Sequence, residues 1–308
     1  MHPAFSVIFF TVSSGAGLGL FALLVLADLF KLGGGMSSQA LLMPGILAIF
    51  LVGAGFLSSV FHLANPKNSW RAVMRFRTSW LSREGVFGLL FFPFASLYLG
   101  LAWLAPESWL PVRYAFGIIV LLLSWAAIFS TGMIYACLKT IRQWNTPLTP
   151  ANYLALGHFS GVLLLLAFLP QEKQGLFVFL AIALLAVAAF LKAIYYFWIV
   201  APHISSTINT ATGFNRSKVK LLDQGHTHGT FLTQEFGFQV ARKYRLILKA
   251  IVFTIAFIYP LMVLIGTPTQ GEMVMAAISA MLGLVVERWL FFAEARHVVN
   301  LYHGAQRC

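Results

Sequence analysis

Charged residues are scarce in this sequence, and their scarcity excludes an ordinary soluble domain. Only 10% of the 308 residues are Asp, Glu, Lys or Arg, whereas 59% are hydrophobic and the mean hydropathy is +0.83. Soluble domains usually contain about 25% charged residues. Apolar runs long enough to cross a bilayer recur along the whole chain, which indicates a polytopic helical membrane protein.

Cysteine is also rare, and the common cofactor-binding motifs are missing. The two cysteines, Cys137 and Cys308, form no metal-binding or redox spacing and no disulfide framework. The sequence contains no Walker loop, dinucleotide fingerprint, nucleophile elbow or iron–sulfur spacing. We therefore expect no metal site in this chain, so another subunit or a diffusing cofactor would have to carry the electrons of any redox reaction.

The apolar runs predict eight transmembrane helices, because each is about 20 residues or longer and a hydrocarbon core is about 30 Å thick. Lipid cannot satisfy free backbone groups, and the runs are too long for the strands of a membrane barrel. The predicted spans are 6–30, 42–63, 84–104, 112–138, 151–170, 175–200, 246–266 and 273–298. The predicted fold class is all-α, with residues 1–308 forming a single integral membrane domain.

Basic residues are distributed unevenly between the two sides of this predicted bundle. The formal net charge is +12, and most of the cations fall in connections on the side that holds both termini. The opposite side receives only Lys31, Arg113 and Lys173. The positive-inside rule therefore places both termini and the basic loops in the cytoplasm. Because the cations lie in short loops between apolar runs, we expect contact with anionic lipid rather than with nucleic acid.

One connection, residues 201–245, is much longer than the others. It is polar and contains the small-residue stretch STINTATG (206–213), a basic cluster and then HTHGTFLTQEFGFQVARKYR. This connection is too short for a separate enzyme domain and too long for a simple helix hairpin. We interpret it as a cytoplasmic loop on which a partner protein docks.

The stretch from His62 to Glu84 is the main candidate for a functional site. A histidine and a glutamate stand at the two ends of a basic, aromatic-rich connection between two spans, and ionisable groups at membrane depth usually have a functional or pairing reason. His62 can exchange a proton near neutral pH, and Glu84 can relay protons between water and a bound, reducible ring. The structural alternatives are an interfacial histidine bonded to a loop carbonyl, and a helix N-terminal acid paired with a neighbouring arginine.

Other ionisable residues favour structural interpretations. Glu287, Arg288 and Glu294 lie in the last predicted span, where adjacent opposite charges need partners inside the bundle, so we interpret them as a charge-compensated network. Asp28 and Lys31, near the outer end of the first span, are interpreted as boundary residues.

Aromatic and histidine residues raise two further questions. Tyr195, Tyr196 and Trp198 are interpreted as part of an interfacial aromatic belt. His158, inside the fifth span, is the candidate for ligating a haem iron, but a b-type haem held by two histidines needs a second one facing it. The sequence leaves that pairing open.

Four segments resemble the membrane-anchor subunit of dimethyl sulfoxide reductase-type enzymes. They are HPAFSVIFFTVSSGAGLGL (2–20), FHLANPKNSWRAV (61–73), WLSRE (80–84) and HGTFLTQEFGFQVARKY (228–244). The likeness extends over essentially the whole chain. Within the family, the sequence is most similar to the anchor of cytoplasmic, sulfite-oxidising molybdoenzyme complexes.

The resemblance implies a three-part complex in the bacterial inner membrane. A molybdopterin catalytic subunit would perform the substrate chemistry, and an iron–sulfur subunit with four clusters would conduct electrons. This chain would contain no iron–sulfur cluster or molybdenum, and would anchor both partners and bind quinone, either ubiquinone or menaquinone. Anchors of this family generally lack haem, so haem b is not expected. The best-known reductases of the family face the periplasm, whereas the charge distribution here favours the cytoplasm.

By match to the family's motifs, His62 and Glu84 occupy the positions used for quinone binding and proton handling, and we predict them as the catalytic pair. The predicted quinone-binding residues are His62, Arg71, Trp80, Ser82, Arg83 and Glu84. Hydrogen bonds from His62 and Arg71 to the quinone oxygens would stabilise negative charge as electrons arrive. Glu84 would pass the compensating protons.

Several other functions remain open at this point. The same fold serves quinone reduction coupled to sulfite oxidation or quinol oxidation by a dimethyl sulfoxide reductase-type enzyme. A transporter would place polar residues or broken helices at mid-membrane. A purely structural anchor would have no quinone pocket, and a dihaem-type anchor would be revealed by its haem spectrum.

Overall fold

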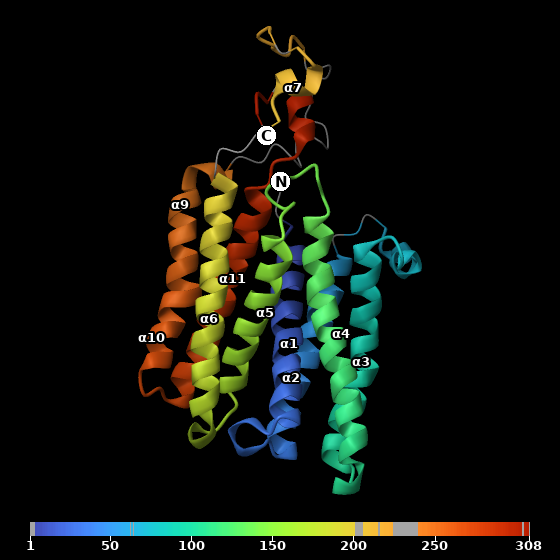
Figure 1. The fold of residues 1–308 in the computed structure, drawn as a ribbon, viewed down its shortest axis with the longest axis vertical. Helices are drawn as coiled ribbons and strands as arrows, with labels where there is room; N and C mark the ends of the chain where they lie inside the picture. The colour runs from blue at the N-terminus through green and yellow to red at the C-terminus, as the bar shows by residue number, and fades with distance from the viewer. Residues whose placement is uncertain are drawn as a thin grey trace.

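The computed structural model describes residues 4–61, 63, 65–200, 206–214, 216–223, 240–303 and 305–307. These residues form a bundle of long helices, with no strand in the described ranges and two isolated β-bridges. In chain order the long helices are α1 (Phe5–Leu29), α2 (Ser38–Val60), α3 (Trp80–Leu104), α4 (Leu110–Ala136), α5 (Leu148–Leu166) and α6 (Gln171–Val200). They are followed by a continuous rod of α9 (Val240–Val252), the π-helical η4 (Phe253–Ile258) and α10 (Tyr259–Ile265), and then by α11 (Gln270–Ala293) (Figure 1).

Seven helices in the described part of the chain are long and apolar enough to cross a membrane. They correspond to every predicted span except 151–170. That segment forms α5, a helix of 19 residues that packs between α1, α4, α6 and α11. The all-α prediction is therefore confirmed, whereas the eighth crossing stays a prediction.

The helix boundaries differ from the predicted spans in one place that matters for the site. The third span was expected to begin at residue 84, but α3 begins at Trp80. Its N-cap is Ser79, whose hydroxyl accepts a hydrogen bond from the Ser82 backbone N–H at 3.4 Å. A serine cap satisfies one of the free amides at a helix start. The segment 80–84 is thus the first turn of a helix and not part of a loop.

Helix α1 is the centre of the bundle. It contacts α2, α4, α5 and α11, and it is the most buried of the candidate spans. Small residues permit the closest of these contacts: a Cβ added at Gly161 of α5 would overlap the backbone of Gly19 and Leu20 in α1. Close approach through small residues is a common way for membrane helices to associate.

Replacing Gly161 by alanine is expected to lower the free energy of unfolding by about 2 kcal/mol, because the added methyl group must push α1 and α5 apart. Gly175→Ala is the matched control, since an added Cβ at Gly175 meets no heavy atom within 4 Å. Thermal unfolding of both variants in detergent measures the difference. Equal unfolding midpoints would show that the α1–α5 contact is not tight.

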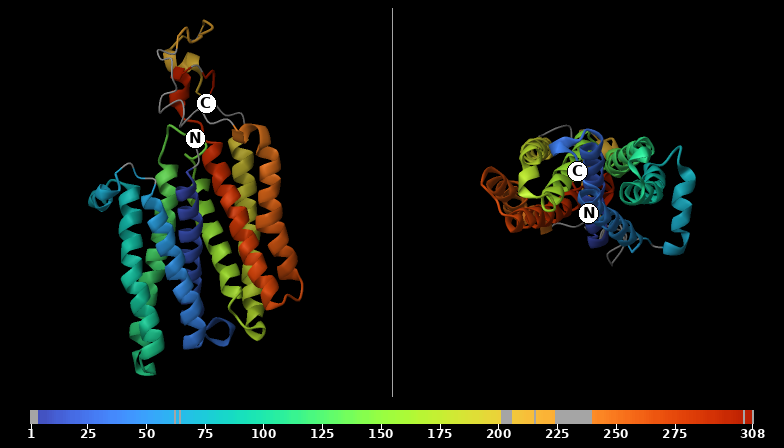
Figure 2. Two further views of the ribbon diagram at one scale, coloured as in Figure 1. Left: turned by 180° about the vertical axis from the view of Figure 1, so that it is seen from behind. Right: turned by 90° about the horizontal axis from the view of Figure 1, so that it is seen from below.

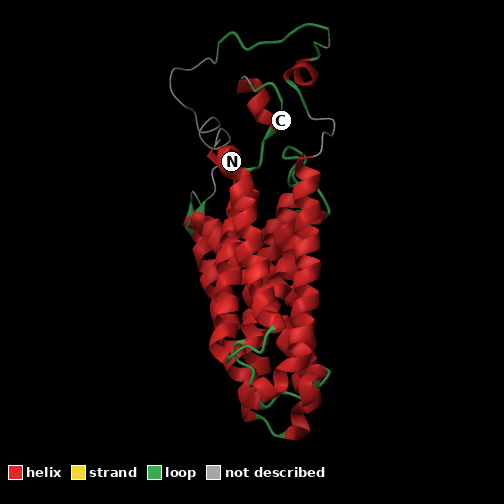
Figure 3. Ribbon diagram, turned by 90° about the vertical axis from the view of Figure 1, so that its left-hand side faces the viewer, coloured by secondary structure: helices red, strands yellow, loops and turns green. Residues whose placement is uncertain are grey.

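The two ends of the bundle differ in what they contain (Figure 1). At the upper end in Figure 1, α1 begins and α11 ends, and the short helices η2 (Pro66–Arg75), α7 (Ile208–Thr212) and η5 (Val298–His303) lie there. At the lower end, short turns carry η1 (Leu32–Gly34) and η3 (Glu107–Trp109). The left view of Figure 2 shows the same division from behind, and Figure 3 shows the long helices running side by side between the two ends. The charge distribution predicts that the upper end, with both termini, faces the cytoplasm, and this orientation stays a prediction.

Residues close to the C-terminus connect two loops at the upper end. Ile141 and His297 form one antiparallel bridge, and Thr207 and Arg307 form the other. Of the long connection 201–245, the structure describes 206–214, 216–223 and 240–245. Its proposed docking role stays a prediction.

Candidate functional site

The first turn of α3 is tied to η2 by the side chain of Ser82. The Ser82 hydroxyl accepts a hydrogen bond from the Arg75 backbone N–H at 3.0 Å and donates one to the carbonyl of Ala72. Ser82 is fully buried. Phe76 and Phe87 pack edge to face beside it, with ring centres 5.6 Å apart. The basic segment η2 is thereby held against the start of α3.

Arg83 points back toward the chain that precedes α3. Its Nε donates to the Phe76 carbonyl at 3.0 Å and its Nη2 donates to the Arg77 carbonyl at 2.8 Å. Its guanidinium carbon lies 4.2 Å from the centre of the Trp80 ring, within the range of a cation–π contact. Trp80 also packs edge to face on Phe129 of α4. Arg83 therefore fixes the chain at residues 76 and 77 to the first turn of α3, and Trp80 packs against its guanidinium group.

Glu84 faces the interior, away from Arg83. Its side chain is buried, and its Oε1 accepts a hydrogen bond of 2.5 Å from the Thr131 hydroxyl of α4. Thr131 also contacts the carbonyl of Ala127, one turn earlier in its own helix, at 3.0 Å. Among the ion pairs formed by the described residues, none includes Glu84. The alternative in which Glu84 pairs with its neighbouring arginine is wrong.

The remaining predicted site residues are divided between the exposed surface and the part of the chain that the structure does not describe. Arg71 is exposed on η2, and its guanidinium carbon lies 5.5 Å from the ring centre of Trp70, which is also exposed. His62 lies outside the described residues. The structure therefore brings Ser82, Trp80, Arg83 and Glu84 together at the start of α3.

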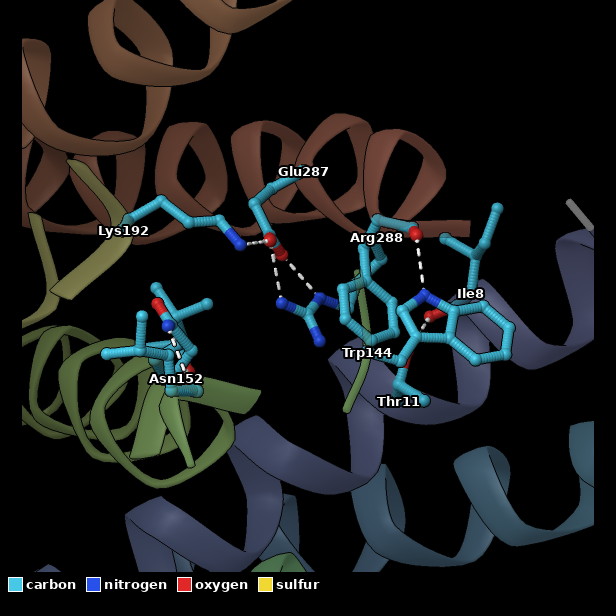
Figure 4. Close-up of polar contacts among 11 residues, drawn as sticks. Ile8, Thr11, Trp144, Asn152, Lys192, Glu287 and Arg288 are labelled. Atoms are coloured by element: carbon cyan, nitrogen blue, oxygen red, sulfur yellow. Dashed lines mark hydrogen bonds and ion pairs between the residues drawn. The ribbon is translucent and has the colours of Figure 1, made fainter. Parts of the chain in front are cut away.

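A second polar cluster lies inside the bundle, on α11 and α6. Glu287 is fully buried, and both Lys192 of α6 and Arg288 of α11 bind its carboxylate (Figure 4). The Arg288 Nη2 donates to Glu287 Oε1 at 2.6 Å. Nearer the upper end, Lys249 of α9 pairs with Glu294 at 2.9 Å. The interpretation of these α11 residues as a charge-compensated network is consistent with these contacts, which add Lys192 and Lys249 as the partners.

Two tyrosines lie between this cluster and Glu84. Tyr135, one helical turn after Thr131, stacks on Tyr153 of α5 with ring centres 5.9 Å apart. The Arg288 guanidinium carbon lies 4.3 Å from the centre of the Tyr153 ring. Both Glu84 and Arg288 are close enough to Tyr153 to interact with it electrostatically. A row of polar groups therefore crosses the bundle from α3 to α11.

A small cavity of about 20 Å³ opens beside this row. Tyr153, Ser160, Glu287, Arg288 and Thr11 contribute to its lining. Neither the Tyr153 hydroxyl nor Arg288 Nη1 has a direct hydrogen-bond partner among the described residues, although both are buried. The volume is sufficient for one water molecule, which needs roughly 10–15 Å³ and two to four polar partners.

Several sequence interpretations need correction. Tyr195 and Tyr196 are buried, and the Lys192 ammonium lies 4.3 Å and 5.0 Å from their ring centres, so they pack on the ion cluster and not in an interfacial belt. Asp28 is buried as well, bound by Arg113 at 2.8 Å and by the Tyr98 hydroxyl at 2.7 Å. Asp28 thus lies at the end of α1, as predicted, but it is buried in an ion pair there.

His158 makes hydrogen bonds with both ring nitrogens. Its Nε2 accepts from Trp125 Nε1 at 2.9 Å, and its Nδ1 donates to the Leu154 carbonyl at 2.8 Å. Ligating an iron through Nε2 would require breaking the bond from Trp125. Within the described ranges, no group of three or more His, Cys, Asp or Glu residues is arranged to hold a metal ion.

Comparisons with known proteins give a consistent result. The family model described as DMSO reductase anchor subunit (DmsC) matches residues 1–293. A curated relative from Allochromatium vinosum, named as a subunit of sulfite dehydrogenase, is 33% identical over 324 aligned residues, which cover 98% of this chain and 99% of the relative. The match to the family model covers helices α1 to α11, including the start of α3.

Proposed function

The chain belongs to the DMSO reductase anchor subunit family, and from this premise we propose that it transfers electrons between an iron–sulfur partner subunit and the membrane quinone pool. It is the membrane anchor of a complex with several subunits. The proposed partners are an iron–sulfur subunit with four clusters and a molybdopterin catalytic subunit. We place them at the upper end of the bundle, on the cytoplasmic face of a bacterial inner membrane, because exposed cations such as Arg71, Arg75 and Lys139 lie at that end.

The buried carboxyl group of Glu84 carries this proposal. Reduction of a quinone to a quinol takes up two electrons and two protons. A quinone site inside the protein therefore needs a side chain that transfers protons to the quinone. Glu84 is such a group, because it is buried one turn below the basic segment and is held by the hydroxyl of Thr131. Tyr135 and Tyr153 extend the polar row from Glu84 into the bundle.

The other predicted site residues have separate roles in this proposal. Ser82 and Arg83 hold η2 and the residues that follow it against the start of α3. Their polar atoms already form hydrogen bonds with the backbone of these residues. Trp80 provides an aromatic surface beside Arg83. His62 and the exposed Arg71 are proposed to donate hydrogen bonds to the quinone oxygens and to stabilise negative charge on them.

The name of the curated relative supports one direction of electron flow. It is called a sulfite dehydrogenase subunit. We propose that the partner subunits oxidise sulfite to sulfate with an oxygen atom from water, releasing two electrons and two protons, and that the electrons reduce quinone in this chain. Quinol oxidation for a dimethyl sulfoxide reductase-type partner is the reverse use of the same site.

Sulfite-dependent reduction of a short-chain quinone analogue by the purified complex tests the proposal. We expect the absorbance of the oxidised quinone to fall when sulfite is added and to stay constant when it is omitted. Activity only with quinol and dimethyl sulfoxide or a similar acceptor would keep the anchor assignment and reverse the direction. Absence of both reactions from an assembled complex would contradict the quinone proposal.

A further inference from the structure

A polar cavity lies at the lower end of the bundle, opposite to the candidate quinone site. Its volume is about 620 Å³, and its lining comes from the ends of α1 and α3, the starts of α2, α4 and α6, and the turns η1 and η3. The lining includes Lys31, Arg113 and Lys173. These are the three cations that the charge distribution assigned to this side of the membrane. The fold therefore gathers them around one cavity.

The three cations are not equivalent. Arg113 is neutralised by Asp28, which lies 2.8 Å away and is buried against Tyr98. Lys173 donates a hydrogen bond of 2.9 Å to the carbonyl of Gly35, so its ammonium is held at the cavity but has no carboxylate partner among the described ion pairs. Lys31 is exposed at the same cavity. Two lysine charges therefore remain available to an anion, against the single further carboxylate of Glu107 in the lining.

Backbone and hydroxyl groups add further donors to the lining. Gly34 and Gly35 have φ values of 83° and 87°, in the left-handed region that glycine adopts without strain. Ser37 and Ser38 follow at the start of α2 and also line the cavity. A helix N-terminus with free amides and hydroxyls favours a phosphate group, and here it supplements the two lysines.

Exposed aromatic side chains surround this end of the bundle. Trp103 and Trp109 are 64% and 52% exposed, and Phe30 is 65% exposed. Trp109 also lines the cavity. Tryptophan is typical of the headgroup level of a bilayer, where its ring is partly in lipid and partly in water. The cavity therefore lies at the depth where lipid phosphates are found.

We propose that this cavity binds the phosphate of a phospholipid headgroup, with Lys31 and Lys173 as its cationic ligands. The acyl chains would leave the cavity along the exposed apolar ends of α3 and α4. A bound lipid would link η1 to η3 and so join the α1–α2 hairpin to the α3–α4 hairpin at the end away from the partner subunits.

Lipid retention by the purified complex tests this proposal. The complex is incubated in detergent with phosphatidylglycerol, and the lipid bound per complex is measured by native mass spectrometry. We expect binding to weaken about fivefold for Lys31→Gln and for Lys173→Gln, and by more for the double variant. Lys139→Gln, which removes an exposed cation at the upper end, is the matched control and should weaken lipid binding less than either cavity variant does.

Two further arms identify the ligand. Diacylglycerol, which lacks the phosphate, is expected not to be retained, and inorganic phosphate alone is expected not to raise the thermal unfolding midpoint. Equal lipid retention by the double variant and the wild type would overturn the proposal. Stabilisation by inorganic phosphate to the same extent as by the lipid would also overturn it, because the site would then recognise a free anion. Quinone-linked turnover of the double variant, expected to match the wild type, shows that the complex is intact.

Discussion

Replacing Glu84 by glutamine is expected to slow quinone-linked turnover by about 100-fold, because a positioned proton-transfer group typically contributes a factor of this order or more. Glutamine keeps the size of the side chain and still forms a hydrogen bond with Thr131, but it cannot exchange a proton. The complex should therefore assemble normally. Steady-state turnover with sulfite and a quinone analogue, normalised to the amount of intact complex, measures the effect.

Two controls separate proton transfer from a general loss of structure. Thr131→Val removes the hydroxyl that binds Glu84 and keeps the carboxyl group, so a smaller decrease is expected. Glu172→Gln changes an exposed carboxylate at the lower end and should leave turnover unchanged. Wild-type turnover in an assembled Glu84→Gln complex would show that the proton enters by another route.

Replacing Glu287 by glutamine is expected to lower the free energy of unfolding by about 3–5 kcal/mol, because it leaves buried cations without their counter-charge. Lys192 and Arg288 both bind this carboxylate in the interior. Lys192→Met should cost less, since it leaves the Glu287–Arg288 pair intact and places an apolar chain of similar length against Tyr195 and Tyr196. Thermal unfolding midpoints of the purified variants show which substitution lowers the stability more.

The difference in stability between Glu287→Gln and Lys192→Met tests whether one carboxylate serves both cations. If Lys192→Met destabilised the protein as much as Glu287→Gln, the cluster would not behave as one anion shared by two cations. Lys249→Met is a third comparison, because Lys249 pairs with Glu294 near the upper end of α11 and is not part of the shared carboxylate. Its loss should cost less than the loss of Glu287, since it leaves one carboxylate unpaired at a site that is less deeply buried.

The helices were largely predictable from the sequence because hydrophobic length dominates the structure of membrane proteins. The exception is instructive. The segment at 148–166 is helical as predicted, but Asn152, Tyr153, His158 and Ser160 lower its apolar character. These polar side chains face neighbouring helices inside the bundle, so α5 depends on α1, α4 and α11 for its environment.

The partners of the buried charges could not be predicted, because they come from helices far apart in the sequence. Asp28 and Arg113 are 85 residues apart, and Glu84 and Thr131 are 47 apart. Lys192 is different, since a signal was present: it is the only charged residue in the apolar run 175–200. A lone charge in a span requires a buried partner, and only the structure identifies that partner as Glu287.

The rate at which quinone oxidises the pre-reduced iron–sulfur subunit tests the central claim most directly. The clusters would be reduced with sulfite or dithionite, mixed with a quinone analogue and followed by stopped-flow absorbance, once in the complete complex and once in the soluble partner subunits without this chain. If this chain provides the quinone site, the clusters are rapidly oxidised only in the complete complex, and Glu84→Gln slows that oxidation. Equal rates with and without this chain would contradict the claim and reduce its role to membrane attachment.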